Sequence, residues 1–165
     1  MSLRVKGGIA VAAVTALAVP MGAYYEGVYP RAYSDPVGIP TECIGETGPG
    51  VRVGVQRYTW DECVARYPVR LQKTWDALGA CIDAEVTVGE GAALISFADN
   101  VGIRATCTST LARLMNAGAV GNIWCHQLTR WDKATLAGIK ITLRGLTKRR
   151  ASELRMCLGQ DWRPE

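Results

Sequence analysis

The chain has 165 residues, enough for one domain with a hydrophobic core. Hydrophobic residues make up 48% and charged residues 21%, which excludes a disordered chain and indicates a globular protein. The net charge of +4 is too mild to demand nucleic acid and suits an acidic polymer, while the single histidine, His126, excludes a His-based metal cluster.

The first 25 residues predict an export segment. Arg4 and Lys6 precede an uncharged run from Gly7 to Tyr25, and a basic start before an apolar run is typical of export signals. As a helix this run would be about 28 Å long, enough to span a bilayer. Its Gly and Ala content and Pro20 make it a weak anchor, and Ala16-Leu17-Ala18 resembles a signal-peptidase site. Three interpretations stay open: a cleaved signal, a permanent anchor, and an uncleaved anchor that later leaves the membrane. A plain core helix would not explain the basic flank.

We expect the function to be organised around Glu26 to Gly48. Two carboxylates, Glu26 and Asp35, have eight residues between them, and Thr41 follows after five more. The Gly and Pro residues among them indicate turns and short strands, and such a segment after a helix can place both acids on facing walls of a cleft. Paired carboxylates suit cleavage of a glycosidic bond. The alternative is that these are ordinary turn residues that cap their own backbone.

Residues 28–58 predict a small β lobe, a hairpin or three-stranded meander, because short runs alternate with Gly and Pro turns. Val51, Val53 and Val55 repeat with the period of a strand. Thr59 to Glu62 then fits a capping box that opens a helical lobe.

The remainder of the chain predicts helices with clear boundaries. The expected helices are 60–67, ended by Pro68; 69–83; one opened by a capping box at Thr87–Glu90 and ended by Gly102; one from Ser109 to Gly118; 121–131; and a last one capped by Thr147, with Ala151, Leu154 and Leu158 inward and Gly159 beyond its end. Residues 133–143 are expected as helix or loop.

Four tryptophans and a basic run are interpreted as structural features rather than as binding sites. Four tryptophans at helical spacing are assigned to the core rather than to sugar stacking: Trp60, Trp75, Trp124 and Trp131. The basic run Lys148 to Arg150, together with Arg144, Lys140, Lys133 and Arg130, is assigned to a solvated helix face, with binding of anions or of substrate carboxylates as the alternatives.

Six widely spaced cysteines behind an export-like start favour three disulfides and an oxidising compartment over six thiols in a reducing cell. Six cysteines allow 15 pairings. Among them we favour neighbours in sequence: Cys43–Cys63, Cys81–Cys107 and Cys125–Cys157.

The chain resembles the phage-type lysozymes, glycoside hydrolase family 24, and in particular their secreted signal-anchor-release endolysins. The likeness covers nearly the whole chain and departs at Pro40, where the family often has an aromatic residue, and at Glu46, where it has a supporting histidine. The motifs that carry it are EG, AYSD and TECIGETG within residues 26–48, LISFADNVG (94–102), STLARLMNAG (109–118) and GLTKRRASELRMCL (145–158).

The resemblance implies an α+β, mainly helical lysozyme-like fold with a small β lobe and an inter-lobe cleft. It implies a catalytic trio in which Glu26 is the general acid and Asp35, with Thr41, positions the attacking water, as in an inverting enzyme. Thr47 and Asn100 fall where the family shapes the cleft or touches sugar. Residues 1–25 would be the signal-anchor-release segment and 26–165 the muramidase domain, with no cofactor and no metal.

We therefore expect an N-acetylmuramidase that hydrolyses peptidoglycan for host lysis. The alternatives are a lytic transglycosylase, which needs one Glu and no Asp35 or Thr41, and a non-catalytic, exported wall-binding module. The expected partners are peptidoglycan and, transiently through residues 7–25, the inner membrane, without nucleic acid. We expect a monomer that is exported, tethered to the inner membrane and then periplasmic.

Overall fold

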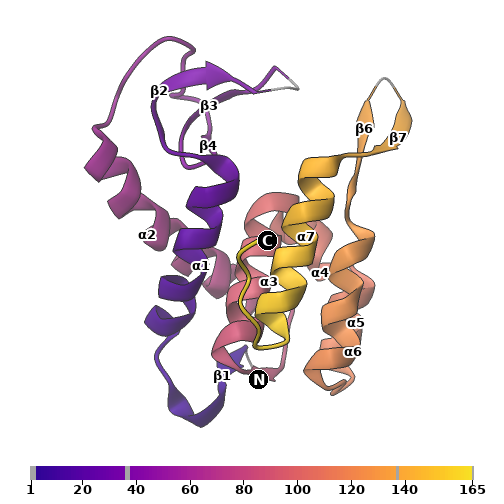
Figure 1. Cartoon of the computed structure of the whole chain (residues 1–165). Helices are drawn as coiled ribbons and strands as arrows, with labels where there is room; N and C mark the ends of the chain where they lie inside the picture. The colour runs from indigo at the N-terminus through magenta and orange to yellow at the C-terminus, as the bar shows by residue number, and fades with distance from the viewer. Residues whose placement is uncertain (1–2, 36–37, 137, 165) are drawn as a thin grey trace. The chain divides into compact units, whose positions relative to one another are not determined.

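The computed structural model describes residues 3–35, 38–136 and 138–164 and shows an α+β protein dominated by helices (Figure 1). The chain forms two compact units. The β unit comprises residues 19–70, and the helical unit comprises residues 1–18 and 71–165. The inter-lobe cleft stays a prediction.

The β unit contains a three-stranded antiparallel meander in the order β2-β3-β4, as expected. The Val51–Val55 alternation was expected to form a strand, and this is wrong: Gly54 adopts φ +83° in a turn, and only an isolated bridge joins Gln56 to Arg31. The strands are β2 (Tyr29–Ser34), β3 (Pro40–Cys43) and β4 (Glu46–Thr47).

Helix α2 (Trp60–Leu78) was expected as two helices separated at Pro68, but it is continuous. A proline inside a helix costs roughly 3 kcal/mol, because it removes a hydrogen bond and crowds the preceding turn. The buried stripe explains why the helix continues through it. The stripe keeps helical spacing across the proline: Cys63, Tyr67, Leu71, Trp75 and Leu78. The Thr59–Glu62 capping box is present, with Thr59 N–H donating to Glu62 at 2.7 Å and Glu62 N–H to the Thr59 hydroxyl at 3.2 Å.

The N-terminal segment folds into β1 (Arg4–Val5), the 3-10 turn η1 (Lys6–Gly8) and helix α1 (Val11–Glu26). β1 pairs in parallel with β5 (Glu85–Val86). α1 is part of the folded protein, since Val14, Ala18 and Met21 are fully buried. In the part of the chain that the structure describes, no helix has both the length and the apolar character needed to cross a membrane.

Helix α3 (Val88–Val101) is the centre of the helical unit. It begins with the expected Thr87–Glu90 capping box, ends at Gly102, and is buried continuously from Glu90 to Ala98. A helix that is apolar on all sides must be covered on all sides. Helices α7 (Arg144–Cys157) and α4 (Ile103–Cys107) pack against α3, and the unit also contains α5 (Thr110–Asn116), α6 (Gly121–Cys125) and the 3-10 helix η2 (His126–Arg130).

Residues 133–143, expected as helix or loop, form an antiparallel hairpin of β6 (Lys133–Leu136) and β7 (Ile139–Thr142). Thr135, Ile139 and Ile141 are β-branched, and Gly138 supplies φ +82° in the turn.

Helix α7 differs from its prediction at both its start and its buried face. Its N-cap is Leu143, and the Thr147 hydroxyl instead donates to Leu143 O at 3.2 Å inside the helix. The inward residues were expected to be Ala151, Leu154 and Leu158, but Ala151 is exposed and the two leucines are half-buried. The buried face is largely polar: Arg149, Arg150, Ser152, Glu153, Met156 and Cys157.

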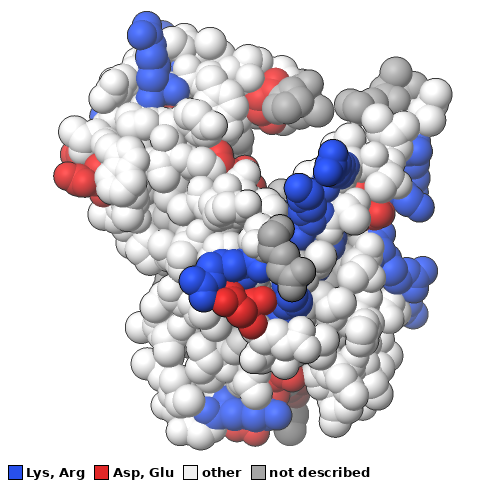
Figure 2. Space-filling view, in the orientation of Figure 1, with Lys and Arg blue, Asp and Glu red and all other residues white. Residues whose placement is uncertain are grey.

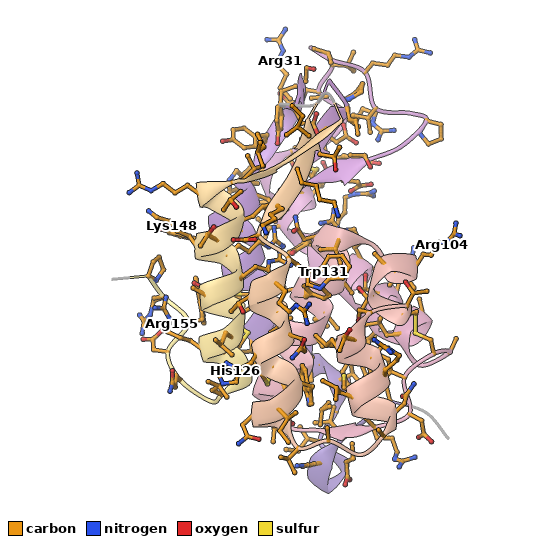
Figure 3. The ribbon with its side chains drawn as sticks, turned by 90° about the vertical axis from the view of Figure 1, so that its right-hand side faces the viewer. Arg31, Arg104, His126, Trp131, Lys148 and Arg155 are labelled. Atoms are coloured by element: carbon orange, nitrogen blue, oxygen red, sulfur yellow. A yellow bond between two sulfur atoms is a disulfide. The ribbon has the colours of Figure 1, made fainter. Side chains whose placement is uncertain are left out.

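The core assignment holds for Trp75 and Trp124, which are 5% and 2% exposed. It is wrong for Trp60, which is 56% exposed on the first turn of α2. Trp131 is half-buried and meets Phe97 edge to face, with ring centroids 5.4 Å apart. Trp131 points among the helices of its unit, whereas Lys148 points away from them (Figure 3).

Three disulfides join cysteines that are neighbours in sequence, which is the pairing we favour: Cys43–Cys63, Cys81–Cys107 and Cys125–Cys157. The first lies within the β unit and the other two within the helical unit. The paired cysteines are 20, 26 and 32 residues apart, in chain order. Each disulfide therefore restricts the unfolded chain within one unit and does not link the two.

Candidate active site

Glu26 is the last residue of α1 and directly precedes the strands of the β unit. Its side chain is partly buried, and the backbone of Gly45 comes close to it. A Cβ atom built on Gly45 would lie 3.2 Å from Glu26 Oε2. Gly45 also adopts φ +67°, so only glycine suits this position without strain. The turn between β3 and β4 therefore forms one wall around the Glu26 carboxylate.

Asp35 and Thr41 are both tied to the backbone of Ile39. The Ile39 N–H donates to Asp35 Oδ1 at 2.7 Å, and the Thr41 hydroxyl donates to the Ile39 carbonyl at 3.0 Å. The same carbonyl accepts the Asp35 N–H at 3.0 Å. One residue thus fixes the orientation of both side chains. Sequence reasoning missed Ile39, because its contribution comes from its main chain and leaves no side-chain signal.

The sheet register places three polar side chains in one row. Thr41 on β3 is paired with Tyr33 on β2 and with Thr47 on β4. Residues directly opposite one another in an antiparallel sheet carry their side chains on the same face. Thr41 is buried at 4% exposure, Tyr33 is half-buried and Thr47 is exposed. Thr47, the candidate substrate-binding residue, therefore shares a sheet face with Thr41, a candidate catalytic residue.

Tyr33 lies near both candidate acids. Burial raises the pKa of the Tyr33 phenol above its usual 10.0, and the negative charges of Glu26 and Asp35 and the phenol of Tyr29 act in the same direction. Tyr33 therefore keeps its proton at neutral pH. Both candidate acids therefore act electrostatically on this one phenol.

A layer of ion pairs supports the strands that carry these residues. Glu42, fully buried next to Thr41, accepts hydrogen bonds from Arg57, with Nε to Oε1 at 3.0 Å. Glu46, expected above as a departure from the resembled family, is paired with Arg66. The hydrogen bond from Arg66 holds the pKa of Glu46 below its usual 4.5, although partial burial opposes this.

The two arginines of this layer flank one aromatic ring. The guanidinium of Arg66 lies 4.1 Å, and that of Arg57 5.3 Å, from the centroid of Tyr58. Such cation–π contacts help to hold both arginines next to their carboxylates. Glu46 is thus engaged in an ion pair within the β unit.

Asn100 lies in the helical unit, unlike the other four candidate site residues. Its side-chain oxygen accepts a hydrogen bond from Arg150 at 2.6 Å. Arg149 and Arg150 are 3% and 1% exposed and both contact the fully buried Glu153, so their assignment to a solvated helix face is wrong. Ser96 on α3 also donates to Glu153 at 2.9 Å. These arginines are structural parts of the α3–α7 contact, and Lys148 alone of the basic run is exposed.

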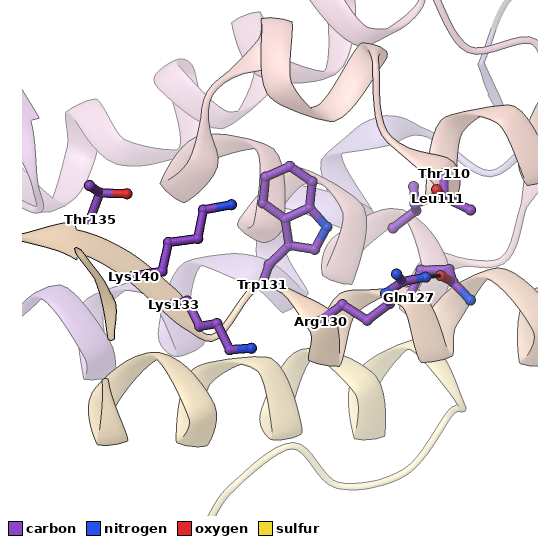
Figure 4. A pocket seen from close by; sticks show the side chains of 8 residues that line it. All are labelled: Thr110, Leu111, Gln127, Arg130, Trp131, Lys133, Thr135 and Lys140. Atoms are coloured by element: carbon purple, nitrogen blue, oxygen red, sulfur yellow. Dashed lines mark hydrogen bonds between the residues drawn. The ribbon is translucent and has the colours of Figure 1, made fainter. Parts of the chain in front are cut away.

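The helical unit has its own basic cavity of about 410 Å³ beside the hairpin (Figure 4). Three cations line it, Arg130, Lys133 and Lys140, together with Trp131. Arg130 is held by Gln127, to which its guanidinium donates at 3.1 Å. Figure 2 shows Lys and Arg side chains over α7 and the hairpin. The other lining residues are Thr110, Leu111, Gln127 and Thr135.

Comparisons with known proteins agree on one family. The family model described as phage lysozyme matches residues 23–153. A SAR-endolysin of Pseudomonas phage phiKMV is 34% identical over 92% of this chain and 89% of its own length. The SAR-endolysin of Enterobacteria phage P21 is 36% identical over 94% and 91%.

Solved structures show the same likeness. The endolysin of Escherichia coli O157:H7 phage FAHEc1 superposes with a TM-score of 0.77 at 28% identity, over 92% of this chain and 95% of that one. The muramidase domain of SpmX from Asticaccaulis excentricus gives a TM-score of 0.76 at 27% identity, over 86% and 95%.

Proposed function

This chain belongs to the phage lysozyme family and is an endolysin, a glycoside hydrolase that cleaves the β-1,4 bond between N-acetylmuramic acid and N-acetylglucosamine in peptidoglycan, and we propose that Glu26, Asp35 and Thr41 carry out this reaction. Glycosidases of this kind need one carboxyl group to protonate the leaving oxygen and a second on the other face of the sugar to act on water. Glu26 takes the first role and Asp35 the second.

The shared contact of Asp35 and Thr41 with Ile39 is the observation that carries this proposal. Because the Thr41 hydroxyl donates its hydrogen to the Ile39 carbonyl, the lone pairs of the hydroxyl oxygen are left to accept hydrogen bonds. An attacking water can then donate one proton toward the Asp35 carboxylate and the other toward Thr41. Ile39 fixes the carboxylate through its N–H, so the two acceptors hold a constant geometry.

The partial burial of Glu26 against Gly45 supports its role as the acid. The Glu26 proton passes to the glycosidic oxygen as the C–O bond breaks, and the water adds to the sugar carbon while its proton moves to Asp35. Thr47 would contact the sugar, since it lies on the same sheet face as Thr41. Asn100 would contribute only indirectly, because its oxygen is engaged by Arg150.

The decisive test is Glu26→Gln, which keeps the shape of the side chain and removes the acid. The clearing rate of a cell-wall suspension should fall by about 10²–10⁴-fold, with an unchanged melting temperature. Asp35→Asn and Thr41→Ala should also lose activity. Asp61→Asn, at an exposed position on α2, is the matched control and should behave like the wild type. A Glu26→Gln variant that clears walls at nearly the normal rate would remove Glu26 from this role.

We further infer that residues 7–25 first lie in the inner membrane, with Arg4 and Lys6 on the cytoplasmic side, and that they later leave it to fold as η1 and α1. The names of the two SAR-endolysin relatives support this order. So does the packing of α1. In the helical unit, a Cβ on Gly91 of α3 would lie 3.2 Å from Val14 of α1 and 3.0 Å from Trp75.

The other half of α1 packs within the β unit. A Cβ on Gly22 would lie 2.0 Å from the Tyr67 hydroxyl oxygen, so the buried Tyr67 ring rests directly on this glycine. While α1 lies in the lipid it cannot make these contacts with the rest of the protein. The tethered enzyme is therefore expected to be inactive, because Glu26, the last residue of α1, is in place only once α1 has folded.

A further inference from the structure

Four of the six tyrosines lie within ten residues of the chain, around Glu26: Tyr24, Tyr25, Tyr29 and Tyr33. Two of them form a closely packed pair on β2. The ring centroids of Tyr29 and Tyr33 are 4.8 Å apart, and the ring planes are tilted by 59°. Four residues of regular strand would separate two such positions by about 13 Å. The register of β2 against β3 shifts between these tyrosines, and this irregularity accounts for the approach of their rings.

The Tyr29–Tyr33 pair lies next to the candidate acids. Tyr33 is the phenol on which Glu26 and Asp35 both act, and it is the partner of Thr41 in the sheet register. Tyr29 rests on Gly27, the residue that follows Glu26: a Cβ on Gly27 would lie 2.5 Å from Cε2 of the Tyr29 ring. Gly27 adopts φ +71°, so it both turns the chain after α1 and makes room for this ring.

Tyr29 nevertheless stays 50% exposed, although its neighbours Tyr33 and Gly27 are only partly accessible. An exposed aromatic ring loses the stabilisation that burial of its apolar surface would bring. Here the ring is held in one position by Gly27 below and Tyr33 beside it, so little conformational entropy remains to be lost when it binds a ligand. A rigid, half-exposed aromatic surface with phenol hydroxyls suits a ligand that is apolar on one face and hydroxylated at its edges.

We propose that Tyr29 and Tyr33 form a platform on which one pyranose ring of the glycan strand stacks beside Glu26. The axial C–H groups of a pyranose ring give it an apolar face for the Tyr29 ring, and its hydroxyl and N-acetyl groups can bond to the phenol oxygens. This inference rests on the proposed function, because it names the sugar-binding surface of the same site. Tyr29 does not touch the reacting bond, so it contributes to binding and sets the position of the strand.

The test measures binding and turnover separately. In the Glu26→Gln background, where no cleavage interferes, binding of an N-acetylglucosamine tetramer is followed by calorimetry. Tyr29→Ala should weaken this binding by about tenfold. In the otherwise wild-type enzyme, Tyr29→Ala should raise KM on solubilised peptidoglycan by a similar factor and leave kcat nearly unchanged, the pattern expected when binding is lost equally from ground and transition states.

Three further variants make the result specific. Tyr29→Phe keeps the ring and should retain most of the affinity, whereas Tyr29→Leu keeps apolar cover on Gly27 but removes the ring and should resemble Tyr29→Ala. Trp60→Ala removes an aromatic side chain that is 56% exposed elsewhere in the same unit and should have no effect. Wild-type affinity in Tyr29→Leu, or an equal loss in Trp60→Ala, would overturn the platform. Failure of the proposed function would show separately: the Glu26→Gln variant would still clear walls, while the effect of the Tyr29 variants on tetramer binding would be unchanged.

Discussion

The Glu26 side chain lies so close to the backbone of Gly45 that a methyl group at residue 45 would have to displace it by a few tenths of an ångström. The Glu26 carboxylate oxygen would lie 3.2 Å, and its carboxyl carbon 3.3 Å, from a Cβ on Gly45, which also has φ +67°. The turn between β3 and β4 thus holds the last residue of α1 through its main chain. The position of the proposed acid depends on a residue that has no side chain of its own.

Gly45→Ala tests this dependence. The left-handed backbone should cost roughly 1 kcal/mol of folding stability, and the added methyl group should displace Glu26 and lower kcat. Gly54→Ala is the matched control, because Gly54 also has a positive φ, +83°, but nothing lies within 4 Å of its added Cβ. Thermal denaturation should show similar losses for both variants, and wall clearing should fall only for Gly45→Ala. Equal activity in the two would show that Gly45 does not position Glu26.

The Glu46–Arg66 pair should make stability depend on pH in a defined range. The pKa of Glu46 is below 4.5 in the folded protein, so the ionised form stabilises the fold at higher pH, and this contribution disappears as the pH falls through the lowered pKa. Both side chains are partly exposed, so the contribution should be no more than about 1 kcal/mol. Glu46→Gln should therefore be less stable than the wild type at pH 7 and equally stable near pH 3, as measured by urea denaturation. A difference that persists at pH 3 would assign the effect to packing instead.

The disulfides should differ in their effect on activity. Removing Cys43–Cys63 or Cys125–Cys157 by paired Ala substitutions should cost about 3–4 kcal/mol of stability in each case, because the loops they close are similar in length. Cys43 is two residues beyond Thr41 on β3 and has φ +51°, a backbone conformation that the bond to Cys63 helps to maintain. Only the Cys43–Cys63 variant should therefore lose activity at a temperature at which both variants remain folded. A comparable loss in the Cys125–Cys157 variant would contradict this.

The proposed release from the membrane should be slowed by substitutions that leave the folded enzyme intact. Ala12 and Ala16 are exposed on α1, so Leu at both positions should leave the folded state intact while strengthening the hold of the lipid by about 0.3–0.6 kcal/mol per residue. Gly8 is unsuitable, because its φ of +68° would strain a leucine. Ala12→Leu/Ala16→Leu should stay in the membrane fraction longer and delay lysis, and Ala12→Ser/Ala16→Ser should do the reverse. Intact-mass measurement of the soluble product checks the same model, since a product that begins at Val19 would show cleavage after Ala18 instead.

Most of the helix boundaries could be predicted because they are local. Thr87 and Glu90, Thr59 and Glu62, and Ser109 form their caps with residues three positions away, so the sequence contains both partners. The errors have tertiary causes. Pro68 does not end α2, because the buried stripe continues on both sides of it, and the polar face of α7 is inward because Ser96 and Asn100 on α3 provide partners for it.

The sequence by itself determined the identity of the candidate acids, the motifs of the family and the presence of six cysteines suited to pairing. These are properties of residue type and spacing, which are written directly in the chain. Only the tertiary structure decided that Ile39 orients Asp35 and Thr41, that Gly45 confines Glu26, and that Tyr29 meets Tyr33 across a shifted register. Those relationships depend on main-chain hydrogen bonds, excluded volume and strand register. Almost any side chain is compatible with these features, so residue type does not reveal them before the fold brings the atoms together.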